Sequence, residues 1–399
     1  MNVSMNLSLN NTQNAFAYKS NTDLNKAKWL FTVIQNPWIV SLGTRFTPML
    51  MKSGLPINGI IRNTIFNQFV GGETLDESAR VTKMLGSYGV QVILDYGVEA
   101  KEGDASFDEV TEQFIKAVEF AATQDNVPFV SVKLTGLSSM HLLERLNDAP
   151  RLRSGIHDSE SDDAAWNRLK ERMYAICDVA ATHGIGILID AEETWIQDPI
   201  DRLAIELMGV YNKEKVVVYN TYQLYRSDRL HFLKISHKIA AEGNFILGAK
   251  LVRGAYMEKE RARAASMGYP SPIQVDKAAT DADFDAGVEF CLEHLDNIAL
   301  IVASHNEASN LKCAQMMQDK GLPNNHPRIH FSQLYGMSDH ISFNMASEGY
   351  QVSKYLPFGP LQDVIPYLMR RAQENSSVNG QTNRELLLIR QEIARRKAK

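Results

Sequence analysis

Eight short apolar runs, rich in β-branched residues, recur along the chain and alternate with longer stretches of helical periodicity. The runs are Val90–Leu94, Phe129–Leu134, Gly186–Ile189, Val216–Tyr219, Ile246–Val252, Ala299–Ala303, Ile329–Phe331 and Gln351–Tyr355. The helical stretches between them include Phe107–Ala122, Ala164–Ala181 and Phe284–Leu295. Near-continuous apolar strands separated by helices are typical of a parallel sheet covered on both faces. Eight such units predict an α/β fold of the (β/α)8 TIM-like barrel type, although periodicity alone also allows a doubly wound sheet.

The segments that flank the eight units are helical in pattern. The apolar residues of the first helical segment share one face, and they are Leu24, Ala27, Leu30, Phe31 and Ile34. Leu75–Gly86 is a second periodic segment, and the only candidate strand in this part is a short one near Trp38–Leu42. We therefore predict an N-terminal helical arm over 1–88, the barrel over 89–377 and a C-terminal helical tail over 378–399. The basic ending RRKAK is expected to be a solvated helix end.

Composition argues against several classes of protein. A net charge of −5 argues against nucleic acid as a partner. No apolar run approaches the ~18 residues of a membrane span, and no signal-peptide or transit-peptide pattern precedes Arg45. Cys177, Cys291 and Cys313 are widely spaced without a C-x-x-C, so we expect buried, reduced thiols. These features predict a cytoplasmic protein.

Common cofactor and metal motifs fail on inspection. The GIG at 184–186 precedes its strand and lacks a third glycine, so it is not a dinucleotide fingerprint. DADFDAG at 281–287 imitates a calcium loop but has Ala286 at position six and Leu292 at position twelve. The sequence contains no H-E-x-x-H and no P-loop. We therefore predict no metal site.

Polar side chains stand at or just beyond the ends of nearly all the apolar runs. They are Asp95, Lys133, Asp190, Gln223, Lys250, Arg253, Ser304, His305, Asn306, Gln333 and Tyr355. In a (β/α)8 barrel the carboxyl ends of the strands converge on one face, where active sites are found. Any one of these residues could be a structural polar group, but their convergence predicts an active site.

The last apolar run leads into the stretch Tyr355–Ser377, which contains a pair of adjacent arginines. The strand is expected to break at Pro357 and at Gly359-Pro360, and a helix then carries Arg370-Arg371 with Glu374 within reach of both. Guanidinium groups bind a small carboxylate through two parallel hydrogen bonds. The alternative is an ordinary surface helix with two solvated arginines.

Four motifs in this order resemble the proline dehydrogenase family, and the resemblance covers roughly residues 65–377. They are VSVKLTGL at 130–137, DAEETW at 190–195, KLVRGAY at 250–256, and YLPFG from Tyr355 followed by YLxRRxxEN. The resemblance implies a distorted (β/α)8 barrel whose last helix caps the active-site face, with FAD bound across the barrel mouth. It also implies oxidation of L-proline to Δ1-pyrroline-5-carboxylate by hydride transfer to FAD, the first step of proline catabolism.

The resemblance further implies partners. Electrons would pass to a membrane quinone, and the protein would therefore associate peripherally with the inner membrane. The product would be consumed by a separate pyrroline-5-carboxylate dehydrogenase.

Individual roles follow from the matched motif positions. Catalytic and substrate-side roles fall on Lys133, Asp190, Lys250, Tyr256, Leu334, Tyr355, Arg370, Arg371 and Glu374. Contacts to FAD fall on Ala191, Gln223, Lys250, Val252, Arg253, Gly254, Ala255, Ser304, His305 and Asn306. Lys133 and the two arginines would hold the substrate carboxylate, and Tyr355 would lie against the ring. Many bacterial members carry arginine at the position of Lys250, so a point charge here replaces a planar fork.

Other functions stay open at this point. From the residues alone, Lys133 is equally compatible with a structural role and with a Schiff-base nucleophile of an aldolase. A 4-hydroxyproline dehydrogenase is the nearest rival, although Tyr355 leaves little room for an added hydroxyl. A non-catalytic barrel that binds a carboxylate is a third reading.

Overall fold

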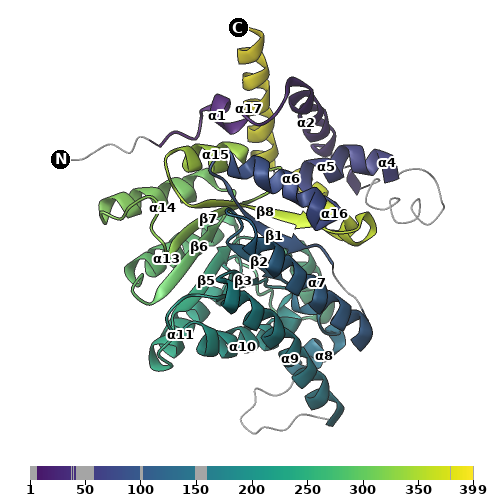
Figure 1. The fold of residues 1–399 in the computed structure, drawn as a ribbon, viewed down its shortest axis with the longest axis vertical. Coiled ribbons are helices and arrows are strands. Elements are labelled where there is room, and N and C mark those ends of the chain that lie inside the picture. Colours follow the sequence, from purple (N-terminus) through teal and green to yellow (C-terminus); the bar gives the residue numbers. More distant parts are fainter. Residues whose placement is uncertain are drawn as a thin grey trace.

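The computed structural model is built around a closed barrel of eight parallel strands in chain order (Figure 1). It describes residues 7–36, 38, 40–41, 58–98, 102–148, 160–377 and 379–398. The strands are β1 Gln91–Tyr96, β2 Phe129–Val132, β3 Gly186–Ile189, β4 Val218–Gln223, β5 Leu247–Val252, β6 Ile298–Ala303, β7 Ile329–Leu334 and β8 Val352–Phe358. The predicted barrel is confirmed, and closure between β1 and β8 excludes the doubly wound alternative.

The predicted break of the last strand at Pro357 is wrong, since β8 continues to Phe358. Pairing of β8 with β7 ends at Tyr355, whereas pairing with β1 continues to Phe358. Beyond Tyr355 the chain before α6 takes the place of β7, and the Gly71 amide donates to the Pro357 carbonyl at 2.8 Å. A proline is tolerated at such a position because it lies outside the β7 ladder and its missing N–H leaves no ladder bond unmade.

Helices and one short 3-10 turn follow the strands and surround the barrel. They are α7 Asp104–Ala122, η2 Leu134–Gly136, α8 Met140–Asp148, α9 Glu160–His183, α10 Thr194–Tyr211, α11 Arg229–Glu242, α12 Met257–Met267, α13 Lys277–Glu293, α14 Glu307–Asp319 and α15 Asp339–Ser347. The main core lies between these helices and the outward side chains of the strands, such as Val130, Val132 and Leu251. All three cysteines are buried and unbridged, as expected.

Inward-facing side chains fill the barrel in layers. One apolar cluster inside the barrel contains Ile93, Phe129, Leu188, Tyr219, Ala299, Ile301 and Tyr355. Because side chains alternate between the two faces of a strand, the residues two positions further along also face inward. Those positions bring Asp95, Ser131 and Asp190 to the next layer, toward the carboxyl ends of the strands. The barrel therefore has an apolar floor below a polar mouth.

The N-terminal arm is helical, as predicted. Its described elements are α1 Thr12–Ala15, α2 Asn21–Ile34, α4 Asn58–Ile61, the π-helix η1 Arg62–Phe66, α5 Asn67–Phe69 and α6 Leu75–Gly86. A capping box between Ser20 and Asp23 starts α2, whose five predicted core residues are all buried. The candidate strand near Trp38–Leu42 is wrong for the residues described there, because Trp38, Val40 and Ser41 are helical and the Val40 amide donates to the Asn36 carbonyl.

Two C-terminal helices, α16 Leu361–Ser377 and α17 Asn379–Lys397, lie with the arm at one end of the molecule (Figure 1). Phe31 of α2, Leu368 of α16 and Leu388 of α17 share a second buried core. The sequence predicted a solvated helix end for the basic ending, and this holds for the exposed Lys397 and Ala398. It does not hold for Arg396, which donates to the Phe16 and Lys19 carbonyls and pairs with Glu392. No helix in the described part of the chain is long and apolar enough to cross a bilayer.

Candidate active site

The carboxylate of Asp190, directly after β3, collects four side chains inside the barrel mouth. Its Oδ1 lies 2.5 Å from the Lys250 Nζ and accepts from the Ser131 hydroxyl at 2.8 Å. Its Oδ2 lies 3.2 Å from the Lys133 Nζ and accepts from the Tyr355 hydroxyl at 2.7 Å. The partners come from the ends of β2, β5 and β8, so closure of the barrel brings them together.

Charge in this cluster is balanced. Burial raises the pKa of Asp190, but the ammonium groups of Lys250 and Lys133 outweigh burial and hold it well below its ordinary value. Asp95 lies 3.6 Å from the Lys133 Nζ and is itself buried. Two lysines thus face two carboxylates. Both carboxylates stabilise the charged form of Lys133, which argues against the neutral amine that a Schiff-base nucleophile needs.

Tyr355 presents its ring to the barrel interior and its hydroxyl to Asp190. Burial, followed by the charges of Asp190 and Asp95, raises the pKa of Tyr355 well above its ordinary value, so the phenol stays a donor. Leu334, the last residue of β7, is in register with Tyr355 and packs beside it. The Lys250 Nζ lies 5.3 Å from the centre of the Tyr355 ring. Tyr256 is half-buried at the start of α12.

The two arginines of α16 differ in their surroundings. Arg370 is half-buried, whereas Arg371 is only 7% exposed and its guanidinium lies 5.1 Å from the centre of the Tyr367 ring. A solvated surface helix therefore does not describe Arg371. Glu374 belongs to α16, but its side chain lies outside the described residues.

The residues expected at the cofactor fall into separate groups. Arg253 donates to the Ser304 and Ser309 hydroxyls, pairs with Asp281 at 3.0 Å, and lies 3.7 Å from the centre of the Phe284 ring. Arg253 belongs to the segment Val252–Ala255, which is half-buried apart from the exposed Ala255.

Two of the expected cofactor residues make their side-chain contacts within the protein. Asn306 caps α14 by accepting from the Ala308 and Ser309 amides. The amide of Gln223, the last residue of β4, donates to the Glu192 carbonyl and the Tyr225 hydroxyl. The structure thus does not bring Gln223 into the Asp190 cluster. Ala191, which follows Asp190, is half-buried.

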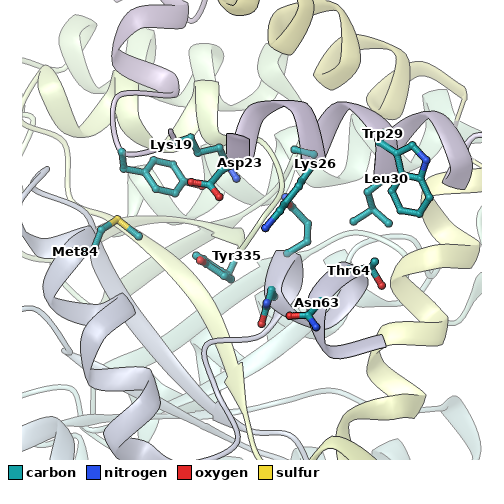
Figure 2. Close-up of a pocket in the computed structure, with 13 residues that line it drawn as sticks. Lys19, Asp23, Lys26, Trp29, Leu30, Asn63, Thr64, Met84 and Tyr335 are labelled. Atoms are coloured by element: carbon teal, nitrogen blue, oxygen red, sulfur yellow. The ribbon is translucent and has the colours of Figure 1, made fainter. Parts of the chain in front are cut away.

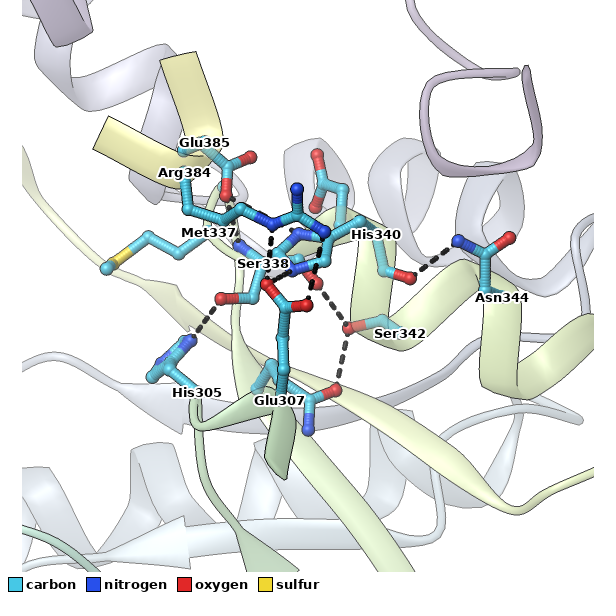
Figure 3. Close-up of polar contacts among 12 residues, drawn as sticks. His305, Glu307, Met337, Ser338, His340, Ser342, Asn344, Arg384 and Glu385 are labelled. Atoms are coloured by element: carbon cyan, nitrogen blue, oxygen red, sulfur yellow. Dashed lines mark hydrogen bonds and ion pairs between the residues drawn. The ribbon is translucent and has the colours of Figure 1, made fainter. Parts of the chain in front are cut away.

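His305 links the end of β6 to the end of β7 (Figure 3). Its Nδ1 lies 2.9 Å from the Ser338 hydroxyl, and its Nε2 accepts from the Leu334 amide at 3.4 Å. Burial, with help from the charges of Lys354 and Arg371, lowers the pKa of His305 to about 3. The imidazole is therefore neutral near pH 7, and its Nδ1 carries the hydrogen that is donated to Ser338.

Sequence reasoning gave no role to Ser131 and Glu192, two buried residues at the mouth, and named Asp95 only among the polar strand ends. Asp95 pairs with Lys133, Ser131 donates to Asp190, and Glu192 accepts from both the amide and the hydroxyl of Thr135. A signal for Ser131 was available, because it precedes Lys133 by two residues and so shares its face of the strand.

A cavity of about 490 Å³ lies between α2, η1, α5 and α6, away from this cluster (Figure 2). Its lining includes Tyr18, Lys26, Trp29, Asn63 and Tyr335, and none of the predicted site residues. The chemistry-bearing side chains lie at the barrel mouth instead.

Comparisons with known proteins agree with this arrangement. The family model described as proline dehydrogenase matches residues 78–384. The carbapenem antibiotics biosynthesis protein CarD of Pectobacterium carotovorum subsp. carotovorum is 34% identical over 82% of this chain and 83% of its own. Proline dehydrogenase 1, mitochondrial, of Dictyostelium discoideum is 32% identical over 96% of this chain and 74% of its own.

Solved structures support the fold. Proline utilization A from Bdellovibrio bacteriovorus matches 92% of this chain with a TM-score of 0.78 at 21% identity, and this chain spans 40% of that protein. At that identity the likeness concerns the fold alone. Together with the match over residues 78–384, it leads to one conclusion: the chain belongs to the proline dehydrogenase family.

Proposed function

We propose that this protein, an oxidoreductase that acts on proline, converts L-proline to Δ1-pyrroline-5-carboxylate with FAD as the hydride acceptor. The observation that carries the proposal is the charge-balanced, apolar-walled cluster at the barrel mouth, followed in the chain by α16 with its buried Arg371. Lys133 and Lys250 already face Asp95 and Asp190. The arginine pair of α16 would add the positive charge that attracts an anionic substrate.

Substrate binding follows from this division of charge. Arg370 and Arg371 would hold the proline carboxylate with their planar forks, and Lys133 would complete its neutralisation. Tyr256, Leu334 and Tyr355 would enclose the aliphatic ring. Asp190 holds the Tyr355 hydroxyl and the Lys133 ammonium in place, so it positions both and is too strongly ion-paired to serve as a general base. Glu374 would offset part of the arginine charge.

The donor set at β5 and β6 fits a flavin dinucleotide. Two cationic side chains, Lys250 and Arg253, stand three residues apart at the end of β5, and hydroxyl and imidazole groups follow β6. The partly exposed segment Val252–Ala255, with Ala191, would lie against the flavin, while Gln223, Ser304, His305 and Asn306 would bind elsewhere on FAD. Bound FAD supplies the capacity to accept a hydride from the ring carbon beside the nitrogen.

The residues of this chain contribute orientation and exclusion of water. When the substrate ring is held ~3–3.5 Å from its acceptor, the entropy loss of bringing the two together has already occurred on binding. This lowers the activation barrier by several kcal/mol. The substrate loses a hydride from carbon and a proton from nitrogen, and a carbon–nitrogen double bond forms.

The later fate of the electrons belongs to the same proposal. A quinone would reoxidise the cofactor, and because quinones are dissolved in the bilayer, the cytoplasmic protein would associate peripherally with the inner membrane. A separate pyrroline-5-carboxylate dehydrogenase would consume the product.

The visible spectrum of the purified protein is the first test. Flavin absorption bands that bleach when L-proline is added without oxygen support the proposal. A colourless protein whose Lys133 is trapped by borohydride with a carbonyl ligand favours an aldolase, and tight proline binding without flavin favours a binding barrel.

Substrate choice between proline and 4-hydroxyproline is tested by Tyr355→Ser. Hydroxyproline dehydrogenase of Xenopus laevis is 32% identical over 84% of this chain, so this rival is a close one. Removing the ring opens space and offers a hydroxyl to a polar substituent that would otherwise be buried unpaired. We expect the ratio of kcat/KM for 4-hydroxyproline over proline to rise, and an unchanged ratio would place Tyr355 away from the ring.

A further inference from the structure

Ser338, in the turn between β7 and α15, adopts a left-handed backbone conformation with φ of 53°. Side chains disfavour this region, so a residue other than glycine stays there only when its neighbours hold it. Two contacts, one part-buried and one buried, do so. The Ser338 hydroxyl lies 2.9 Å from the His305 Nδ1, and the Ser338 amide donates to Glu385 Oε2 at 3.0 Å (Figure 3).

Glu385 belongs to the C-terminal helix α17, and its neighbour Arg384 contacts the adjacent loop. Arg384 pairs with Glu307 at 2.8 Å, and Glu307 is the first residue of α14, two positions after His305. His340 lies between the two carboxylates, with its Nε2 3.0 Å from Glu307 and its Nδ1 3.9 Å from Glu385 (Figure 3). Two consecutive residues of α17 thus hold the loops that follow β6 and β7.

The contacts continue from these loops to the substrate wall. The neutral His305 donates to Ser338 and accepts from the amide of Leu334. Leu334 packs beside Tyr355 at the barrel mouth. A displacement of Ser338 would therefore be transmitted through one imidazole to Leu334.

Helix α17 does not need Glu385 to stay attached. Leu386, Leu388 and Ile389 are nearly or fully buried in the core shared with α2 and α16. A carboxylate that merely anchored the helix would be a costly choice, since burying a charge is unfavourable without specific partners. The Glu385 side chain points toward the Ser338 amide, which indicates that it holds the turn after β7 and does not simply anchor α17.

We infer that Glu385 is a positioning residue of the active site, which acts through Ser338 and His305 to set the place of Leu334. The inference rests on the proposed function for what Leu334 touches, namely the substrate ring.

Steady-state kinetics of Glu385→Ala test the inference. We expect KM for proline to rise roughly 3- to 30-fold, the range seen for changes along a physical network. The kcat should change less than about twofold, because an apolar wall contacts the ring equally in the ground and transition states. Glu385→Gln keeps an acceptor oxygen for the Ser338 amide, so its KM for proline should stay close to the wild-type value.

Glu392→Ala is the matched control. Glu392 is also a buried carboxylate on α17, but it contacts Arg395, Arg396 and Thr12, away from the barrel mouth. Its loss should lower the melting temperature and leave KM unchanged. If Glu385→Ala and Glu392→Ala lower the melting temperature alike and neither moves KM, the positioning role is wrong.

A double-mutant cycle covers the case in which Glu385→Ala fails to fold. The effects on KM of Ser338→Ala and of Glu385→Asp, whose shorter side chain withdraws the carboxylate from the Ser338 amide, should be less than additive, because both act through one route. Full additivity would overturn the inference.

Hydrogen exchange separates this inference from the proposed function. In the holoprotein, amides over residues 332–340 should exchange faster in Glu385→Asp than in wild type, and not in Glu392→Asp. Hydrogen exchange is measured without proline turnover. If proline fails to bleach the flavin of the wild-type protein, only the proposed function is wrong. Unchanged exchange over 332–340 would defeat the positioning role.

Discussion

At the scale of single residues, the mouth of the barrel is governed by the pairing of buried charges. An isolated carboxylate in the place of Asp190 would take up a proton instead of staying charged. The two lysines within 3.2 Å prevent this. The same lysines would be left uncompensated if Asp190 were removed. Asp190 is therefore as important for the charge state of its neighbours as for their orientation.

Arg371→Ala should lower kcat/KM for proline by about 10- to 150-fold, the cost of one lost charge-assisted hydrogen bond of roughly 1.5–3 kcal/mol. Arg371→Lys should also impair turnover, because an ammonium cannot reproduce the planar fork. Parallel changes at the half-buried Arg370 provide the comparison, with flavin content and melting temperature measured beside the kinetics. Near wild-type kcat/KM in the variants of both arginines would rule out the carboxylate clamp.

Glu192 should make stability depend on pH. Burial is the main cause that raises the pKa of Glu192 to about 7, from an ordinary value of 4.5. Between these pH values the folded protein holds a proton that the unfolded chain has released. The free energy of unfolding therefore falls as pH rises from 4.5 to 7, by about 3 kcal/mol at 1.36 kcal/mol per pKa unit.

Glu192→Gln removes this titration while keeping partners for Thr135. In denaturant unfolding at pH 4.5, 6 and 7.5, the free energy of unfolding should fall less with rising pH for Glu192→Gln than for wild type. Glu258→Gln, at an exposed position, serves as the control, and its free energy of unfolding should depend on pH as that of the wild type does. Parallel curves for Glu192→Gln and wild type would contradict the prediction.

At the scale of elements, the two ends of the chain form one unit over the barrel. Helices α2, α16 and α17 share a core of their own, and Arg396 joins α17 to the loop between α1 and α2. The helix that carries the arginine pair is thus supported from both termini. The predicted boundaries at residues 88 and 377 stay predictions, but the packing indicates that arm and tail act together.

Leu388→Ala should destabilise the protein by about 2–5 kcal/mol, because it opens a cavity in the core that α17 shares with α2. Leu388 is fully buried, whereas its neighbour Leu387 is 48% exposed. Leu387→Ala is therefore the matched control and should stay within about 0.5 kcal/mol of wild type. Chemical denaturation of both variants measures the difference, and equal effects would show that α17 does not share this core in solution.

At the scale of the whole molecule, closure of the barrel places groups from β2, β5 and β8 on the single carboxylate that follows β3. The loops after β5, β6 and β7 then form a rim in which donors converge. A cofactor bound there would contact several strand ends at once and would bind only the folded chain.

Removal of FAD should therefore lower thermal stability. A ligand at 100 times its Kd stabilises the folded state by about 2.7 kcal/mol, and the melting temperature should rise again when FAD is restored. Riboflavin, which lacks the pyrophosphate and the adenosine of FAD, is the control and should restore less. Arg253→Ala should weaken the effect of FAD. A melting temperature independent of FAD in the wild type would contradict the cofactor assignment.

The order of strands and helices was readable from the sequence, because burial on both faces of a strand and on one face of a helix leaves a periodic pattern of local origin. The strand ends were read less well, since Pro357 stays in β8 only because the chain before α6 replaces β7 there. The motif positions that belong to the barrel mouth were also identified.

Several of their partners were not. The pairing of Lys133 with Asp95, the turn of Gln223 toward Glu192, and the reach of Glu385 to Ser338 join residues on different elements. Such pairs depend on strand register and on where α17 packs, which no local pattern of residues encodes. The sequence by itself determined which motif residues stand at the strand ends, and only the tertiary structure decided which further residues join them at the barrel mouth and which of these pair with one another.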